Sequence, residues 1–402
     1  MITGNESLLQ IATEYPQLIA FFEKQGLGAY FDPHSLRKIG PYLSVNTLLK
    51  SKDMNANIFL DTLNEALDKT SEAKTAETKV SAEGLHFSAM LPCGLRNPFK
   101  EFFETLIQEN EDYFDSLNYL IEGNVNHELS YYPLLDNITD LKELPDMIMA
   151  SDVNNFFHRP FMERFIKKGI FTAYKPYEGN TYLEKSAYSD PQANFTMFTA
   201  NMLVMAVDKE QLGDRKMPSQ WSDLLSDQFY DSIVMRGEDD FFCNAVMLPF
   251  YKEHGFEAIK KLASNIAAGM HPAQMVKLAG SKQEQSKAVY ILPYFFAKKI
   301  KKSSVEIVWP SDGAIASPVF LLLKKEALKK HQTLLDLLTS KKMGQMLQGR
   351  LFPSMHPELS HEAFPEAVKW LGWDFIYNHD IGQLKDEIRN QFMEIWTTKN
   401  HL

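Results

Sequence analysis

The sequence predicts an α/β protein preceded by a small all-α domain. From residue 85 onward, short apolar strands alternate with helical segments, which is typical of a sheet with parallel neighbours. Residues 1–67 carry only helical patterns. Between these two parts, residues 68–84 contain a single large apolar residue, Val80, and cannot bury enough surface to offset their ordering entropy. We therefore expect residues 68–84 to be a linker.

The composition excludes several classes of protein. A chain of 402 residues with 45% apolar and 23% charged residues is globular and long enough for two or three domains. Its net charge of −10 argues against a nucleic-acid partner, and two cysteines, Cys93 and Cys243, give no disulfide framework. No apolar run reaches the length of a membrane span. The first residues lack the basic start and apolar core of a signal peptide, so we expect a cytoplasmic protein.

Residues 1–67 have the spacing of three short helices. The first begins after Asn5 or Ser7, the second follows Pro16, and the third covers residues 56–67. Because so few residues bury only a small core, we expect this domain to contact a partner.

The α/β part has an ordered series of expected elements. Strands are expected at residues 85–91, 117–121, 146–150, 202–207, 233–236, 288–292, 305–309 and 319–323. Helices are expected at residues 99–107, 218–225, 242–252 and 255–268, and over most of the chain after residue 324. Ligands of such sheets bind beyond the carboxyl ends of strands. The candidate site loops are therefore residues 92–97, 151–156, 236–240 and 311–315.

Two stretches share a pattern of small polar residues next to an apolar strand. Residues 309–325 contain a tight Ser-Asp-Gly turn and then an apolar run without alternation, which predicts a strand buried on both faces. Residues 194–207 have a comparable pattern. The two stretches are compatible with two crossings between a pair of lobes. They are also compatible with two ordinary strands of one sheet, which the pattern alone favours.

Each candidate loop has a functional and a structural interpretation. Backbone N–H groups at residues 92–97, with Arg96 nearby, suit a carboxylate or phosphonate, while the alternative is a connecting loop with Arg96 in solvent. Cys93 is either a reactive thiol or simply a small residue. Ser151 and Asp152 either hydrogen-bond a ligand or cap a helix. The acidic turn at residues 237–240 either binds a cation or, as we favour, stabilises a helix N-terminus.

No catalytic or metal-binding motif is present in the sequence. The eleven histidines show no H-E-x-x-H spacing, and there is no C-x-x-C, P-loop or G-x-G-x-x-G motif. No Ser-His-Asp order has motif support either. We therefore predict no catalytic residue, no metal site and no cofactor.

Three stretches have an order and spacing that resemble a known family. They are L-P-D-M-I-M-A-S at 144–151, P-S-Q-W-S-D-L-L at 218–225 and W-P-S-D-G-A at 309–314. Through them, residues 85–402 resemble the extracellular solute-binding proteins of ABC importers, which have the type II periplasmic-binding fold and include binders of ferric iron, thiamine, polyamines and phosphonates. The resemblance implies two lobes with a ligand in the cleft between them. The first lobe would be residues 85–199 and 317–402, and the hinge and second lobe residues 200–316.

The resemblance also bears on the aromatic residues after the strand at 288–292. Ferric-binding relatives place two adjacent tyrosines there as iron ligands, but here Phe295 follows Tyr294, so direct ferric coordination is not expected. Tyr294 and Phe295 are instead expected as an aromatic wall of the cleft, and Tyr290 as a core residue. Together, the candidate ligand-binding residues are Cys93, Gly94, Arg96, Ser151, Asp152, Asn201, Gly237, Asp239, Tyr294, Asp312, Gly313 and Ala314.

Residues 1–67 resemble a small helical domain of unknown function that occurs alone or fused to other bacterial proteins. The resemblance rests on Glu14-Tyr15-Pro16, on Gly26 and on the closing L-N-E-A-L at 63–67. Some relatives carry paired cysteines in this domain, and because this chain has none there, a metal or redox role for it is doubtful.

The sequence therefore favours a non-enzymatic solute-binding protein that closes two lobes around a small ligand. Its expected partners are that ligand and an ABC permease. One alternative is an intracellular ligand-sensing regulator or carrier that contacts a partner through residues 1–67. Another alternative is an enzyme on the same scaffold, which would use Cys93 or the carboxylates at 238–240.

Overall fold

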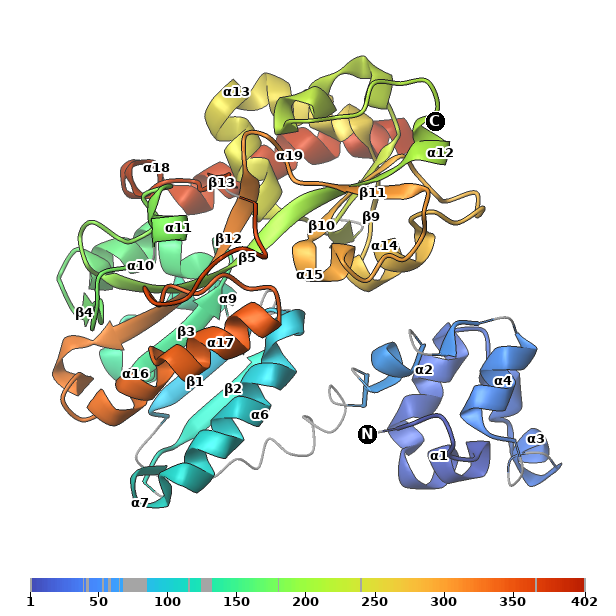
Figure 1. Cartoon of the computed structure of the whole chain (residues 1–402), viewed down its shortest axis with the longest axis horizontal. Coiled ribbons are helices and arrows are strands. Elements are labelled where there is room, and N and C mark those ends of the chain that lie inside the picture. The colour runs from blue at the N-terminus through green and yellow to red at the C-terminus, as the bar shows by residue number, and fades with distance from the viewer. Residues whose placement is uncertain are drawn as a thin grey trace. The chain divides into compact units, whose positions relative to one another are not determined.

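The chain divides into two compact units, Met1–Val80 and Ser81–Leu402, and each has its own hydrophobic core (Figure 1). The computed structural model describes residues 2–38, 40, 43–52, 54–56, 59–64, 66–67, 85–114, 116–123, 132–179, 181–238, 241–365 and 367–400. The expected linker and Asp239 lie outside these residues. Within them, no helix is long and apolar enough to cross a membrane.

The first unit is helical, as the sequence predicted. Its helices include α1 (Leu8–Glu14), α2 (Ile19–Lys24), α3 (Pro33–Lys38) and α4 (Val45–Ser51), and residues 59–64 are also helical. Ser7 caps α1, because its hydroxyl accepts a hydrogen bond from the backbone N–H of Gln10 at 3.1 Å. Pro16 opens a short 3₁₀ turn that leads into α2. The sequence prediction missed α3 and α4, which follow the turn at Gly26.

One continuous sheet runs through the second unit in the order β2-β1-β3-β12-β5-β10-β6-β9. These strands are β1 (Phe87–Leu91), β2 (Tyr119–Gly123), β3 (Met147–Ser151), β5 (Phe195–Asp208), β6 (Ile233–Met235), β9 (Ile266–Gly269), β10 (Val289–Pro293) and β12 (Ala314–Lys324). Three short strands pair beside this path: β4 (Phe171–Thr172), β11 (Val305–Val308) and β13 (Val368–Lys369). A separate hairpin consists of β7 (Gly237–Glu238) and β8 (Phe241–Phe242).

The long strands β5 and β12 belong to both lobes (Figure 1). In the first lobe, β1, β2 and β3 are parallel to one another, and β12 pairs antiparallel with β3. In the second lobe, β10, β6 and β9 are parallel, and β5 pairs antiparallel with β10. Both interpretations that the sequence allowed therefore hold. The two strands are neighbours in one sheet, and both cross from lobe to lobe.

Helices cover the two halves of this sheet. In the first lobe they are α6 (Cys93–Glu109), α7 (Glu111–Phe114), α9 (Tyr132–Leu135), α10 (Arg159–Phe161), α11 (Thr181–Glu184), α16 (Gln332–Leu338), α17 (Lys341–Gly349) and α18 (Trp373–Asn378). In the second they are α12 (Lys209–Leu212), α13 (Asn244–Asn265), α14 (Pro272–Leu278) and α15 (Tyr294–Ala297). The helix expected at residues 255–268 was wrong at its end, because Ile266–Gly269 pairs with β6 as β9.

The last helix, α19 (Ile381–Asn400), contacts both lobes. Near its start, Lys385 Nζ lies 3.1 Å from Nε2 of His158 in the first lobe. Near its end, Lys399 Nζ lies 3.0 Å from the carboxylate of Asp231 in the second lobe, and the helix packs along α13. The predicted assignment of residues 317–402 to the first lobe leaves out this second contact.

A partly buried ionic cluster joins the residue before β3 to the end of β12 and the segment that follows it. Asp146 accepts hydrogen bonds from His331 Nε2 at 2.9 Å and from Lys330 Nζ at 3.2 Å. Lys324 Nζ lies 3.8 Å from the same carboxylate and donates to the carbonyl of Leu144 at 2.7 Å. Burial acts to raise the pKa of Asp146, but the hydrogen bonds from His331 and Lys330 outweigh it and hold this pKa well below its usual value.

Replacing Asp146 with Asn should lower the free energy of unfolding at pH 7.5 by about 2 kcal/mol, because charge-assisted hydrogen bonds to a half-buried carboxylate are lost. The folded-state pKa is lower than the unfolded one. The carboxylate therefore stabilises the fold above about pH 4, and this contribution is lost as the pH falls through the folded-state pKa. Urea unfolding at several pH values should show the difference between wild type and variant shrinking below pH 4.

The matched control is Asp227→Asn. Asp227 also pairs with a lysine, Lys261, but its side chain is 92% exposed, so we expect a change below about 0.5 kcal/mol. A difference between wild type and Asp146→Asn that stays constant from pH 7 to pH 3 would contradict this interpretation of the cluster.

Candidate functional site

Residues of both lobes line a cavity of about 60 Å³ at the point where β5 and β12 pass from one lobe to the other. A second cavity of about 40 Å³ adjoins it and shares Asp152, Asn201, Arg236, Pro293 and Ser317 with the first. The remaining residues that line the larger cavity are Pro92, Cys93, Ser151, His271, Pro272, Phe295 and Phe296. Four of the predicted ligand-binding residues are thus brought together: Cys93, Ser151, Asp152 and Asn201.

The carboxyl end of β3 supplies Ser151 and Asp152. The hydroxyl of Ser151 donates to the carbonyl of Met90 on the neighbouring strand at 3.3 Å. Asp152 has a φ of 70°, which is uncommon for a residue other than glycine and costs on the order of 1 kcal/mol. Its backbone N–H donates to Pro318 on β12 at 2.8 Å. The capping role considered for these two residues belongs instead to Asn154, whose side chain accepts from the N–H of Phe156.

The two lobes touch at Gly94, at the start of α6. A Cβ atom added to Gly94 would lie 2.3 Å from the ring of Phe295 on α15 of the second lobe, so only glycine fits without a shift. The Phe295 ring stacks in turn on Phe352, with their centroids 5.3 Å apart. The lobes are therefore in contact along this edge of the cavity.

Asn201 and Ser317 are direct neighbours on β5 and β12. The Oδ1 atom of Asn201 is buried and accepts no hydrogen bond from any residue that the structure describes. A buried acceptor without a donor costs about 1–3 kcal/mol. The cavity thus contains a polar group that the described residues around it leave unsatisfied.

The second lobe contributes Arg236 and His271, which the sequence reasoning missed. Arg236 lies between β6 and β7, next to the predicted residue Gly237, which does not line the cavity. His271 precedes α14, and its Nδ1 accepts from the N–H of Ala273 at 3.2 Å, so in the neutral ring Nε2 carries the proton. Arg236 follows a strand end in a loop that the sequence had already selected. That position is the signal by which it could have been found.

Other predicted residues lie outside this cavity. Arg96 packs beside Gly123 at the end of β2, where a Cβ atom on Gly123 would be 3.6 Å from Arg96 Cδ. The hydroxyl of Tyr294 points to the carbonyl of Ala363 at 3.5 Å, and its ring packs edge-on against Trp309.

The turn that contains Asp312, Gly313 and Ala314 has a structural role. Asp312 accepts from the backbone N–H of Trp221 at 3.2 Å and pairs with Lys369 at 2.7 Å. The carbonyl of Gly313 accepts from the Trp221 ring N–H at 2.8 Å, and Gly313 has the positive φ, 102°, that the sequence predicted for this turn. The bonds to Trp221 fix the turn within the second lobe, and the pair with Lys369 attaches it to β13.

The groups that line the cavity include both donors and acceptors of hydrogen bonds. A guanidinium, an imidazole, two hydroxyls, an amide and a carboxylate surround a small space between two bodies. Among the residues that the structure describes, no group of three or more His, Cys, Asp or Glu side chains could hold a metal ion.

The sequence profile of a family described as bacterial extracellular solute-binding protein matches residues 142–379, more than half of the chain. The curated proteins give no significant match. The profile does not reach residues 1–80, so the resemblance of that unit to a domain of unknown function stays a prediction.

Solved structures show the same two-lobed fold, which confirms the fold expected from the resemblance. An ABC transporter structure from Clostridium perfringens has a TM-score of 0.55 at 16% identity, covering 78% of this chain and 99% of that chain. A ferric binding protein from Campylobacter jejuni has a TM-score of 0.53 at 12% identity, with 78% and 98% covered. The periplasmic binding protein AfuA from Actinobacillus pleuropneumoniae, with exogenous fructose-6-phosphate bound, has a TM-score of 0.52 at 16% identity, with 79% and 99% covered.

Replacing Gly94 with Ala should hold the lobes apart, because the new methyl group collides with the Phe295 ring. Amide hydrogen exchange should become faster around Phe295 and Phe352, whose rings form this contact. In a Phe295→Ala background the collision is absent, so adding Gly94→Ala there should cause no further increase in exchange.

Gly349→Ala is the control, since a Cβ atom there meets no other atom within 4 Å. Exchange in Gly94→Ala that equals wild type would show that the lobes do not meet at this point.

Proposed function

This chain belongs to the family of bacterial extracellular solute-binding proteins, and we propose that it is a non-enzymatic binding protein whose lobes close around a small ligand at their junction. The observation that carries this proposal is the origin of the cavity-lining residues. Ser151 comes from the first lobe, Arg236 and His271 from the second, and Asn201 from a strand that belongs to both. A ligand that contacts all of them binds most tightly when the lobes are closed, so it shifts the population toward closure.

The lining favours a polar ligand with an anionic group. Arg236 and His271 can donate to an anion, and the guanidinium fits a carboxylate or a phosphate in a bidentate manner. Asn201 Oδ1 and the carboxylate of Asp152 are acceptors, so the ligand should also carry hydroxyl or amine donors. At about 60 Å³ the closed cavity admits only a small group, and a larger ligand requires the lobes to separate further.

Membership of this family also supports an importer as the physiological setting. We propose that the partner of the closed protein is the permease of an ABC importer and that binding takes place outside the cytoplasm. The first residues had suggested a cytoplasmic protein instead. Fractionation of host cells with an antibody against residues 85–402 tests this, because the proposal requires the chain in the extracytoplasmic fraction.

Replacing Asn201 with Leu separates ligand binding from folding. The leucine removes an unsatisfied buried acceptor, so the ligand-free protein should keep its melting temperature or gain about 1 kcal/mol of stability. A donor on the ligand loses its partner, so stabilisation by a small-molecule extract of the host should fall strongly. Thermal unfolding with and without the extract measures both effects.

The control is Asn265→Leu in the second lobe. Asn265 Nδ2 donates to the carbonyls of Leu224 and Ser226 at 2.8 and 3.0 Å, so this change should destabilise the ligand-free protein by about 1–3 kcal/mol. Stabilisation by the extract that is equal in wild type and Asn201→Leu would place the ligand elsewhere.

A further inference from the structure

A second site in the second unit is a cavity that lies away from the lobe junction. It has a volume of about 590 Å³, within the range of small-molecule sites, and it is lined by residues 174–179, 184, 189, 196–198, 338–340, 343, 344, 347, 354 and 355. All of these residues belong to the first lobe. A movement of the second lobe therefore leaves the walls of this cavity in place.

The floor of the cavity is apolar. It consists of side chains that are at most 8% exposed: Met197, Phe198, Leu338, Met343, Leu347 and Met355. Three of them are methionines, whose flexible thioethers adapt to ligands of different shape and contact aromatic rings favourably.

The frame of the cavity is held by hydrogen bonds between segments that are distant in sequence. The hydroxyl of Tyr177 donates to the carbonyl of Thr339 at 2.9 Å, and burial raises the pKa of Tyr177 to about 12, so this hydroxyl keeps its proton. The backbone N–H of Tyr174 donates to Thr196 on β5 at 2.7 Å. Ser340 caps α17 through the N–H of Met343. The cavity is therefore preformed.

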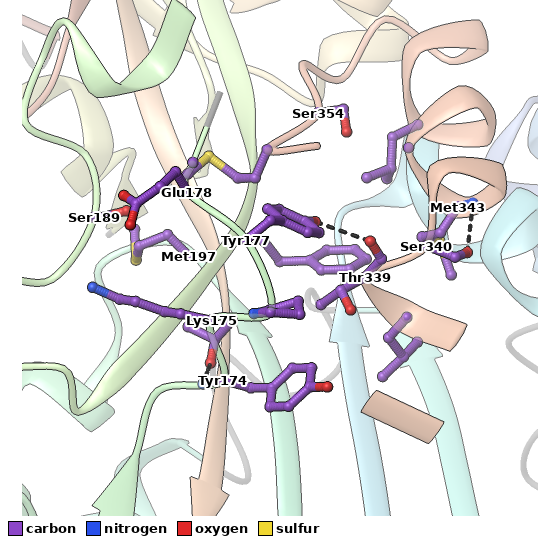
Figure 2. A pocket seen from close by; sticks show the side chains of 18 of the residues that line it. Tyr174, Lys175, Tyr177, Glu178, Ser189, Met197, Thr339, Ser340, Met343 and Ser354 are labelled. Carbon is purple, nitrogen blue, oxygen red and sulfur yellow. Dashed lines mark hydrogen bonds between the residues drawn. The ribbon is translucent and has the colours of Figure 1, made fainter. Parts of the chain in front are cut away.

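Two carboxylates stand on one side of the cavity. In Figure 2, Glu178 and Ser189 lie on one side of the Tyr177 ring, and Ser340 and Met343 lie on the other. Glu184 accepts a hydrogen bond from Ser189 at 2.5 Å. Neither Glu178 nor Glu184 forms an ion pair with a residue in the described part of the chain.

The charge of this side is negative overall. Lys175 is the cationic side chain among the lining residues, and its Nζ donates to the backbone carbonyl of Asp190 at 3.4 Å. With Glu178 and Glu184, the lining carries two carboxylates and one ammonium group, a net charge of −1.

We propose that this cavity binds a small organic cation, namely a primary amine on an aromatic or branched apolar body. The ammonium group pairs with Glu184 and Glu178 beside the face of Tyr177, which favours a cation. The apolar body lies on Phe198 and the three methionines, where burial contributes about 25 cal/mol per Å². This site is separate from the junction cavity and does not depend on the ligand bound there.

The test uses three probes of nearly equal shape and different charge: 2-phenylethylamine, 2-phenylethanol and 3-phenylpropanoate. Isothermal titration of the full chain at pH 7 should give a dissociation constant of about 1 mM or lower for the amine. The alcohol should bind at least about tenfold more weakly, and the carboxylate should not bind, because it meets Glu178 and Glu184.

Two substitutions in the cavity test the contact. Glu184→Gln should weaken amine binding about tenfold while leaving binding of the alcohol unchanged. Glu178→Gln should weaken it in the same direction, and because Glu178 is exposed this variant folds as wild type does. Glu358→Gln is the control, since Glu358 pairs with Lys341 outside the cavity and should not affect binding.

The Asn201→Leu variant should bind the amine like wild type, because Asn201 lies in the junction cavity. No binding of the amine, equal binding of all three probes, or loss of binding in Asn201→Leu would each overturn the proposal. So would amine binding that neither glutamate substitution changes. A failure of this site would leave the junction cavity and its ligand unaffected.

Discussion

The pairing of β5 with β12 is the constraint on which the rest of the second unit depends. Each strand forms ladder hydrogen bonds with the other and with one lobe's own strands, β3 on one side and β10 on the other. The sheet of each lobe is therefore incomplete without β5 and β12. The ladder passes from one lobe to the other near Asn201 and Ser317, which are direct neighbours on the two strands.

The position of the candidate ligand site follows from this pair. The carboxyl end of β3 brings Ser151 and Asp152 to one side of the crossing, and the end of β6 and the start of α14 bring Arg236 and His271 to the other. Groups from both lobes therefore line the same small cavity. The helix α19, which contacts His158 at one end and Asp231 at the other, adds a second connection between the lobes on a different path.

The sequence predicted those cavity-lining residues whose positions can be inferred from their neighbours in the chain. Ser151 and Asp152 follow a buried strand and precede a helical turn, and that pattern is local. The turn at Asp312 to Ala314 has a similar local pattern, but the structure gives it Trp221 and Lys369 as partners. A Gly-containing turn has the same sequence pattern whether it faces a cavity or another part of the protein. His271 and β9 could not be predicted for the same reason, because their roles come from residues distant in the sequence.

Native mass spectrometry of the protein, purified from its own host without denaturation, would show whether the lobes hold a small solute at the junction. We expect a mass above that of the bare chain, and this extra mass should disappear on unfolding and be absent from the Asn201→Leu variant. Slow dissociation from a closed cavity makes the complex observable. A bare mass for the wild type, even after incubation with the small molecules of its host, would contradict the account.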